Sequence, residues 1–198
     1  MSTVDQQKVR RTRTGLIAHD PALAQPGYTL FAPMFGDGTV YLVDMDGTVA
    51  HTWRLPYRPG LYGYLLDNGH LFYGGKVMED LTRFEAWPRF KGGAVLEVDW
   101  RGRVLWEVRH PDHHHDARRL RNGNVLLLCL APLSAELAGT VRGGLPGTEA
   151  DGTIYADYLL EITTREEVVW EYVSPHFAHE PGAPGLNNWV FRALRPRQ

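Results

Sequence analysis

The stretch VYLVDMDGTVAHTW at residues 40–53 decides the fold, because a related stretch returns twice further along the chain. The second copy, VLEVDWRGRVLW, spans residues 95–106, and the third, YLLEITTREEVVW, spans residues 158–170. Each copy pairs two runs rich in β-branched residues across a polar turn and ends in a tryptophan. A proline then closes each copy, at Pro56, Pro111 and Pro175. A strand–turn–strand unit that recurs about every 50 to 60 residues is typical of blades that bury their apolar faces against one another.

A second kind of hairpin lies between the copies. Apolar runs flank Asn68-Gly69 and again Asn122-Gly123, and Asn-Gly is a favoured pair at the tip of a tight β-hairpin. A tryptophan hairpin plus the Asn-Gly hairpin that follows it makes four strands, which is one propeller blade. The sequence therefore predicts an all-β, propeller-type protein with four-stranded antiparallel blades. Because no Asn-Gly hairpin follows the third copy, we predict a partial propeller of about three blades, whereas a closed propeller needs about four to eight.

The chain divides into an irregular N-terminal arm, residues 1–26, and a single partial propeller domain, residues 27–198. A short strand at 28–33 precedes the first copy. Two insertions interrupt the repeat: 77–90, where we expect a helical turn, and 132–138, where we expect a short helix ended by Gly139. A glycine-rich loop at 143–147 and a final strand at 189–193 complete the predicted elements.

Composition excludes several classes of function. The net charge of −2 over 198 residues predicts no broad field for nucleic acid or for a membrane surface. We find no secretory signal and no run long enough to span a bilayer, so a cytoplasmic location is the expectation. Cys129 is the single cysteine and lies in an apolar run. We therefore expect a buried strand residue and no disulfide.

The densest chemical cluster is the segment HPDHHHD at residues 110–116. Neutral imidazole can act as a nucleophile, a general base or a metal ligand, and a carboxylate can fix its tautomer. In a regular strand, His113 and His115 would share one face while His114 opposes them. The alternative is a polar surface loop. The spacing fits no closed zinc motif, so we predict neither a metal nor another cofactor, although a metal-dependent hydrolase or lyase stays open until the protein's metal content is measured.

Two arginines and two tyrosines are candidate substrate-binding residues. Arg118 and Arg119 follow the histidines directly, and a guanidinium suits bidentate binding of a sulfate or phosphate group. A charged outer strand face is the alternative for at least one of them, because alternation allows only one to point with His114 or Asp116. Tyr62 and Tyr64, on the matching strand of the first unit, can stack on an aromatic ligand or pack within the blade.

Together these segments resemble the bacterial arylsulfotransferase-like propeller family. The resemblance is carried by GYTLFAP at 27–33, DGTVYLVDMDG at 37–47 and His114-His115-Asp116 with LRNGN at 120–124. It continues through VVWEYVSP at 168–175 and NNWVFR at 187–192. It extends over residues 12 to 195.

The resemblance implies a reaction as well as a fold. In that family a sulfuryl group moves from an aryl sulfate to a phenol through a transiently sulfurylated histidine, while other histidines and an arginine hold the sulfate oxygens. Carried over to this chain, it makes His115 the first candidate for the reacting imidazole and His114 the second. Asp116 would orient one of them, and Arg118 or Arg119 would hold the anion. The expected partners are a small aryl sulfate and a phenol.

The chain departs from that family in its middle blades, which are missing. Two resolutions follow. Two or more copies could associate and close a ring, since closure removes exposed strand edges. Alternatively, the shortened chain is inactive. A non-catalytic propeller scaffold that binds a partner through its rim loops is the rival class of function.

Overall fold

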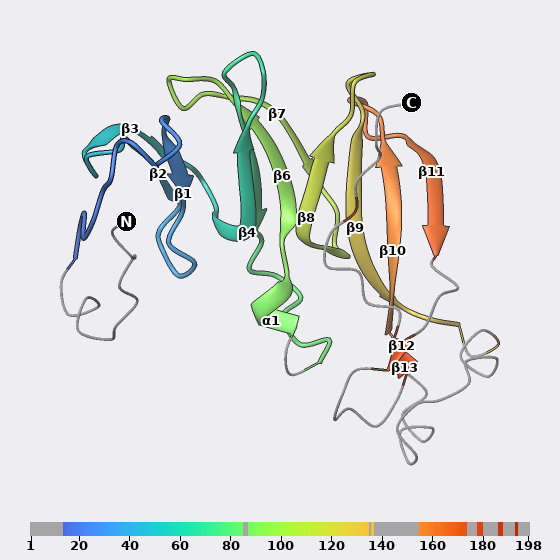
Figure 1. The fold of residues 1–198 in the computed structure, drawn as a ribbon. Coiled ribbons are helices and arrows are strands. Elements are labelled where there is room, and N and C mark those ends of the chain that lie inside the picture. Colours follow the sequence, from blue (N-terminus) through green and yellow to red (C-terminus); the bar gives the residue numbers. More distant parts are fainter. Residues whose placement is uncertain are drawn as a thin grey trace.

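The molecule is built almost entirely of β-strands, as its computed structural model shows (Figure 1). The structure describes residues 14–84, 87–134, 136, 155–173, 178–179, 186–187 and 193. Within these ranges the strands form three antiparallel sheets of three or four strands, and the four-residue helix α1 (Trp87–Phe90) is the single helix with assigned bounds. The prediction of an all-β protein is confirmed. A closed propeller is not present in the described part of the chain.

The three sheets follow one another in chain order. The first contains β1 (Thr29–Phe31), β2 (Thr39–Val43) and β3 (Val49–Arg54). The second contains β4 (Arg58–Leu65), β5 (Leu71–Lys76), β6 (Gly93–Val98) and β7 (Val104–Arg109). The third contains β8 (His113–Arg119), β9 (Val125–Pro132), β10 (Tyr155–Ile162) and β11 (Val168–Val173). The two-residue strands β12 (Ala178–His179) and β13 (Leu186–Asn187) pair with each other.

The sequence-based grouping of hairpins into blades was wrong. The second and third tryptophan hairpins each pair with the Asn-Gly hairpin before them, so that β6–β7 joins β4–β5 and β10–β11 joins β8–β9, while β2–β3 pairs with β1. The reason lies in the prolines. Pro56 and Pro111 occupy the short links from β3 to β4 and from β7 to β8, where the chain leaves one sheet for the next. Proline lacks the N–H that a continuing ladder needs, so these residues mark sheet boundaries.

The turn inside each tryptophan hairpin has one construction in all three sheets. The side-chain oxygen of its first residue accepts hydrogen bonds from the backbone N–H groups two and four residues later. That first residue is Asp44, Asp99 or Thr163. The fourth residue has a positive φ, which is 77° at Gly47, 85° at Gly102 and 68° at Glu166.

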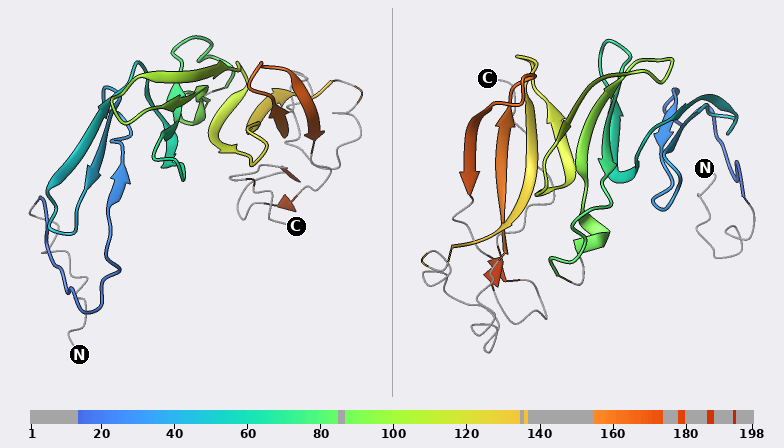
Figure 2. Two further views of the ribbon diagram at one scale, coloured as in Figure 1. Left: turned by 90° about the horizontal axis from the view of Figure 1, so that it is seen from above. Right: turned by 180° about the vertical axis from the view of Figure 1, so that it is seen from behind.

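Apolar residues fill the spaces between consecutive sheets. One buried cluster joins the first sheet to the second through Val40, Trp53, Leu71 and Leu96. Another joins the second sheet to the third and consists of Phe72, Val95, Val108, Ala117, Val125, Leu127, Cys129, Leu160 and Ile162. As expected, Cys129 is a buried strand residue. Seen from above in Figure 2, the sheets follow one another along an open arc, with the first sheet and β11 toward its two ends.

Other expectations are met or lie beyond the described residues. The strand near Tyr28, both Asn-Gly hairpins and the helical turn in the 77–90 insertion are present. The described parts of the chain contain no helix long and apolar enough to cross a membrane. The helix expected at 132–138 falls largely outside the described residues, and so do the loop at 143–147 and the strand at 189–193.

Candidate functional site

The three-histidine run lies in a bulge on β8, the first strand of the third sheet. The ladder with β9 pairs His113 with Cys129 and resumes at Ala117 with Leu127, so three residues, 114–116, oppose one residue of β9. In the second sheet, β4 has the same irregularity, because Pro59 pairs with Gly75 and Gly63 with Tyr73. A bulge re-aims side chains and is common beside functional sites.

The bulge corrects the prediction that His114 opposes its two neighbours. Alternation of faces holds only while the ladder is regular, and here it is interrupted at the histidines. The rings of His114 and His115 meet instead, with Nδ1 of one 2.9 Å from Nδ1 of the other. The two adjacent imidazoles therefore form a pair, and His113 stands apart from it.

His113 has a structural environment. Its Nδ1 accepts a hydrogen bond from the backbone N–H of Gly93 at 3.0 Å, so its proton belongs on Nε2. The ring is 1 % exposed. Loss of hydration, aided by the neighbouring His114, lowers the pKa of His113 to about 3. At neutral pH this ring is uncharged and holds the start of β8 against the second sheet.

A carboxylate from β10 completes the histidine pair. Asp157 is 2 % exposed, and its Oδ1 lies 3.3 Å from Nε2 of His114. Nε2 of His114 makes no hydrogen bond, so the contact with Asp157 is electrostatic. A carboxylate there favours the proton on Nε2 of His114, so Nδ1 of that ring accepts from Nδ1–H of His115. Nε2 of His115 then carries the lone pair.

The order Asp157–His114–His115 separates the roles of the two histidines. His115 is 8 % exposed, against 5 % for His114 and 1 % for His113, so it is the ring closest to solvent. An imidazole whose second nitrogen donates to a neutral acceptor presents a basic nitrogen to a substrate. The arrangement can therefore perform nucleophilic or general-base chemistry at Nε2 of His115.

Arg118 and the two tyrosines come together, although they derive from different sheets. The guanidinium carbon of Arg118 lies 4.8 Å from the ring centre of Tyr62 and 4.9 Å from that of Tyr64. The two rings are 5.6 Å apart and tilted by 47°. Burial raises the pKa of the Tyr64 hydroxyl. The phenol is therefore neutral at neutral pH. A cation between two aromatic faces suits an aryl anion.

Arg119 is engaged in the protein interior. It forms an ion pair with Glu97, donates to the carbonyl of Gly123 at 2.8 Å and stacks on Trp106 at 4.6 Å. These contacts join the second and third sheets. Of the two arginines, Arg118 is thus the one that faces the tyrosines.

Helix α1 and the residue after it cover the histidine pair. The ring centre of Trp87 lies 6.4 Å from that of His114, and Phe90 lies 6.3 Å from His115. Lys91 forms an isolated β-bridge with His114 and is 2 % exposed. Burial lowers the pKa of the Lys91 ammonium group. The helical turn predicted in this insertion is present as α1, and its position over the histidines follows from the bridge.

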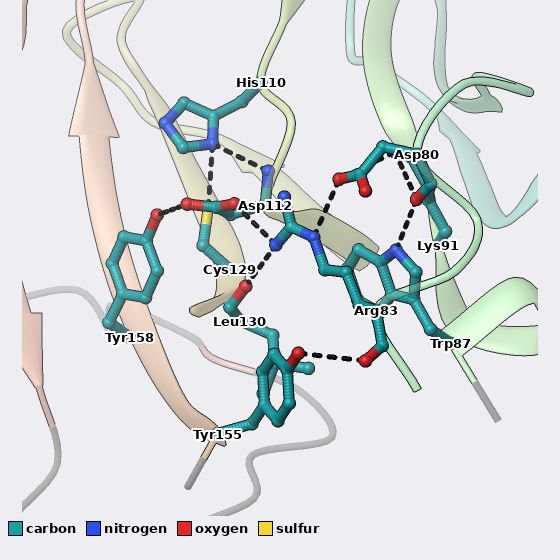
Figure 3. Close-up of polar contacts among 10 residues, drawn as sticks. All are labelled: Asp80, Arg83, Trp87, Lys91, His110, Asp112, Cys129, Leu130, Tyr155 and Tyr158. Carbon is teal, nitrogen blue, oxygen red and sulfur yellow. Dashed lines mark hydrogen bonds and ion pairs between the residues drawn. The ribbon is translucent and has the colours of Figure 1, made fainter. Parts of the chain in front are cut away.

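A polar network fastens this cover to the third sheet (Figure 3). Arg83 forms an ion pair with Asp112 at 2.6 Å and donates to the carbonyl of Leu130 at 2.9 Å. Tyr158 donates to the other oxygen of Asp112 at 2.5 Å, and Tyr155 donates to the carbonyl of Arg83 at 3.0 Å. The insertion between β5 and β6 is thereby held across the interface between the sheets.

The sequence missed Asp157 and the anchoring role of Arg83. A carboxylate in the apolar strand β10 was the available signal, because a buried charge in a strand needs a partner. Asp116 is 3 % exposed, and its orienting role stays a prediction. Within the described ranges, no group of three or more His, Cys, Asp or Glu side chains is arranged to hold a metal ion.

Comparisons with known proteins leave the family open. No family model matches the chain, and no curated protein does. A solved structure that is similar belongs to a protein of unknown function from Bacteroides caccae, with 17% sequence identity and a TM-score of 0.44. The similarity covers 75% of this chain and 46% of that chain, so this chain spans less than half of the neighbour's length. We draw no functional argument from a likeness at this level.

Proposed function

We propose that this protein transfers a sulfuryl group from an aryl sulfate to a phenol through Nε2 of His115. The single observation that supports this most is the buried Asp157–His114–His115 series, which presents a basic imidazole nitrogen from a bulged strand. The fold we propose for the chain is part of a β-propeller, with each sheet as a blade and β4 and β8 as inner strands.

The proposed chemistry needs no redox partner. The lone pair on Nε2 of His115 attacks the sulfur atom, forming an N–S bond while the S–O bond to the aryl group breaks and the phenolate leaves. The oxygen of a second phenol then attacks sulfur, the N–S bond breaks, and its proton passes to the departing imidazole or to water. Asp157 supports the sequence by stabilising positive charge on the histidine pair as it develops.

The aryl and anionic parts of the substrate match the residues near the pair. Tyr62 and Tyr64 offer aromatic faces, and Arg118 supplies a cation between them. Arg118 lies three positions after His115, which is about 10 Å along an extended strand and less across a bulge. That span suits a ligand with a ring at one end and a charged ester at the other. The cover over His115 would have to move aside for entry, as lids do in many enzymes.

The test is turnover of 4-nitrophenyl sulfate in the presence of a second phenol. Nitrophenolate release is followed by absorbance, and the sulfated acceptor is identified by mass spectrometry. His115→Gln should lower the rate on the order of 10³-fold or more, as removal of a nucleophile does. His70→Gln is the matched control, because His70 pairs with Glu97 in the second sheet and lies outside the bulge. Its rate should equal that of the wild type.

Two outcomes would overturn the proposal. One is equal turnover by the His115→Gln variant and the wild type. The other is no turnover of any aryl sulfate by a folded protein, which would favour the non-catalytic scaffold. Intact-protein mass spectrometry after a rapid quench adds a direct readout, since a sulfurylated His115 gains one SO₃ group and the His115→Gln variant gains none.

A further inference from the structure

Each sheet packs on the next one in the same orientation, so every sheet has two distinct faces. We call the face that packs on the next sheet in chain order the forward face, and the opposite one the back face. Back faces in the second and third sheets are closed off, since Tyr73 is 2 % and Leu127 is 0 % exposed. The residue at the same register position in the first sheet is Phe31, which is 46 % exposed. The back face of the first sheet is thus more exposed at this position than the back faces of the other two sheets, within the part of the chain that the structure describes.

The forward face of the third sheet is open at its outer strand. Trp53 on β3 is 1 % exposed and Val108 on β7 is 4 % exposed, because the next sheet covers each of them. Their register equivalent on β11 is Tyr172, which is 40 % exposed. The adjacent aromatic, Trp170, is also 40 % exposed. An apolar back face and an apolar forward face are therefore exposed at the two ends of the stack.

A specific hydrogen bond recurs wherever two sheets meet. The outer strand of one sheet carries an aromatic ring whose nitrogen lies at the second carbonyl of the next sheet's hairpin turn. His51 Nε2 is 2.8 Å from the carbonyl oxygen of Trp100, and Trp106 Nε1 donates to that of Thr164 at 3.0 Å. On β11 the equivalent ring is Trp170.

The first sheet has the turn that such a ring would need. Its hairpin turn is capped by Asp44, whose Oδ1 accepts from the N–H groups of Asp46 at 3.0 Å and Thr48 at 2.8 Å. Asp99 caps the turn of the second sheet in the same way, at 2.9 Å for both bonds. Met45 therefore occupies the place of Trp100, with its carbonyl in the equivalent position.

We propose that two copies of this chain bind head to tail, with the β11 side of one copy on the back face of the first sheet of the other. Tyr172 would cover Phe31 across this contact, and the ring of Trp170 would lie against the turn that contains Met45. The contact is heterologous, so two such contacts between two copies close a ring. Six sheets in one ring lie within the range of about four to eight that propellers use. The proposal stands independently of the sulfuryl-transfer reaction.

The surface around the first sheet's turn suits this occupant. The groove there is lined mainly by apolar residues from β1, from the turn and from residues 14–24, including Leu16, Leu23 and Phe31. Leu16 is 51 % and Leu23 is 78 % exposed. A second copy brings the forward face of a sheet, and forward faces already pack on back faces twice within the chain. An unrelated partner would have to reproduce the same register.

The first test is the solution mass of the purified full chain, measured by light scattering coupled to size exclusion over a range of concentrations. Wild type should have the mass of two copies. Phe31→Arg and Tyr172→Arg should each raise the dissociation constant at least about tenfold, as loss of a central aromatic contact does. Leu105→Arg is the control, because Leu105 is 42 % exposed on β7 within the stack. It should leave the mass unchanged, and circular dichroism confirms that each variant folds.

The second test fixes the geometry by disulfide trapping. A Phe31→Cys variant and a Tyr172→Cys variant should cross-link to each other when mixed, and neither should cross-link to itself. A monomer at every concentration overturns the proposal. A Tyr172→Cys homodimer would show a symmetric contact and overturn it too, as would a mass that grows with concentration beyond two copies, which denotes an open polymer.

Discussion

The second and third sheets have the same strand arrangement but different side chains in the bulge of their first strand. Both have four antiparallel strands, the same polar turn and the same three-against-one bulge on the first strand. In the second sheet the bulge holds Gly60, Leu61 and Tyr62, and in the third it holds His114, His115 and Asp116. The carboxylate that faces His114 is Asp157 on β10, whose register equivalent on β6 is Gly93.

The difference separates what the fold requires from what the site requires. A backbone bulge forms equally well around apolar and around ionisable side chains, so the bulge itself belongs to the repeat. Where the third sheet meets the cover formed by α1, the bulge places His114 and His115 beside the buried carboxylate of Asp157. Burying such groups costs free energy unless they are fully paired, and Nε2 of His114 has only the electrostatic contact with Asp157. The polar series is therefore the part of the third sheet on which the proposed chemistry depends.

Asp157→Asn should have the largest effect on this contrast. An amide cannot compensate positive charge on His114 and no longer fixes its tautomer, so kcat should fall by about 10²- to 10⁴-fold with little change in KM. Turnover assays across pH provide the measurement.

The control for Asp157→Asn is Glu161→Gln on the same strand. Glu161 is also buried and accepts hydrogen bonds from Asn122 and Asn124, so its loss tests whether any buried carboxylate of β10 matters. Equal losses of kcat in both variants would contradict a specific role for Asp157.

His113 should give the third sheet a pH dependence that the second sheet lacks, because Pro59 occupies its place on β4. The pKa of His113 is about 3 in the folded chain and about 6.5 when unfolded. Between these values His113 binds a proton in the unfolded chain and not in the folded chain. Through His113 alone, the free energy of unfolding should therefore fall by about 1.4 kcal/mol for each pH unit as pH drops below about 6.5.

Urea unfolding between pH 7 and pH 4.5 measures this slope. The His113→Gln variant removes the titrating group, so its slope should be smaller than that of the wild type by the contribution of one histidine. Its stability at pH 7 should also be lower, because the bond from Gly93 N–H is perturbed. An unchanged slope would mean that His113 is hydrated enough in the folded chain to bind a proton.

Features set by residues close together in the sequence could be predicted, whereas contacts between residues far apart in the sequence could not. The strands and hairpins follow from local patterns, and so did the prediction of an all-β repeat. The grouping of hairpins failed because the alternatives differ only in which sheet a hairpin joins, and the deciding residues, Pro56 and Pro111, were treated as ends of copies rather than as links. The contact between Asp157 and His114 was not predicted either. The two residues lie 43 positions apart in the chain, and only the register of β10 on β9 brings them together.

Tyr158→Phe should destabilise the protein by about 1.5 kcal/mol, the low end for a hydrogen bond to a charged group. The hydroxyl donates to Asp112, and Arg83 still pairs with that carboxylate after the change. Burial raises the pKa of the Tyr158 hydroxyl, so it is a donor throughout the usable pH range. At the equivalent place in the second sheet stands Ala94, which makes no such bond.

Tyr155→Phe is the matched control for Tyr158→Phe, and chemical denaturation measures both. Its hydroxyl donates to a neutral backbone carbonyl, so its loss should cost less, about 0.5–1 kcal/mol. The reverse order of the two costs would mean that the contact to Asp112 contributes little to holding the sheets together.

Glu166→Gly should give the smallest effect and the only gain in stability. Glu166 has φ 68° at the turn position where the second sheet has Gly102 at 85°. A residue with a Cβ is destabilised by roughly 1–2 kcal/mol in this region, and glycine removes that strain. Glycine also gives the unfolded chain more conformational freedom, which cancels part of the gain. The net expectation is a gain of about 0.5–1 kcal/mol in the free energy of unfolding. Glu167→Gly, one residue later and without a positive φ, should lower stability instead. If both changes lower it, the strain assigned to the third turn is absent, and the turns of the two sheets differ in sequence without differing in energy.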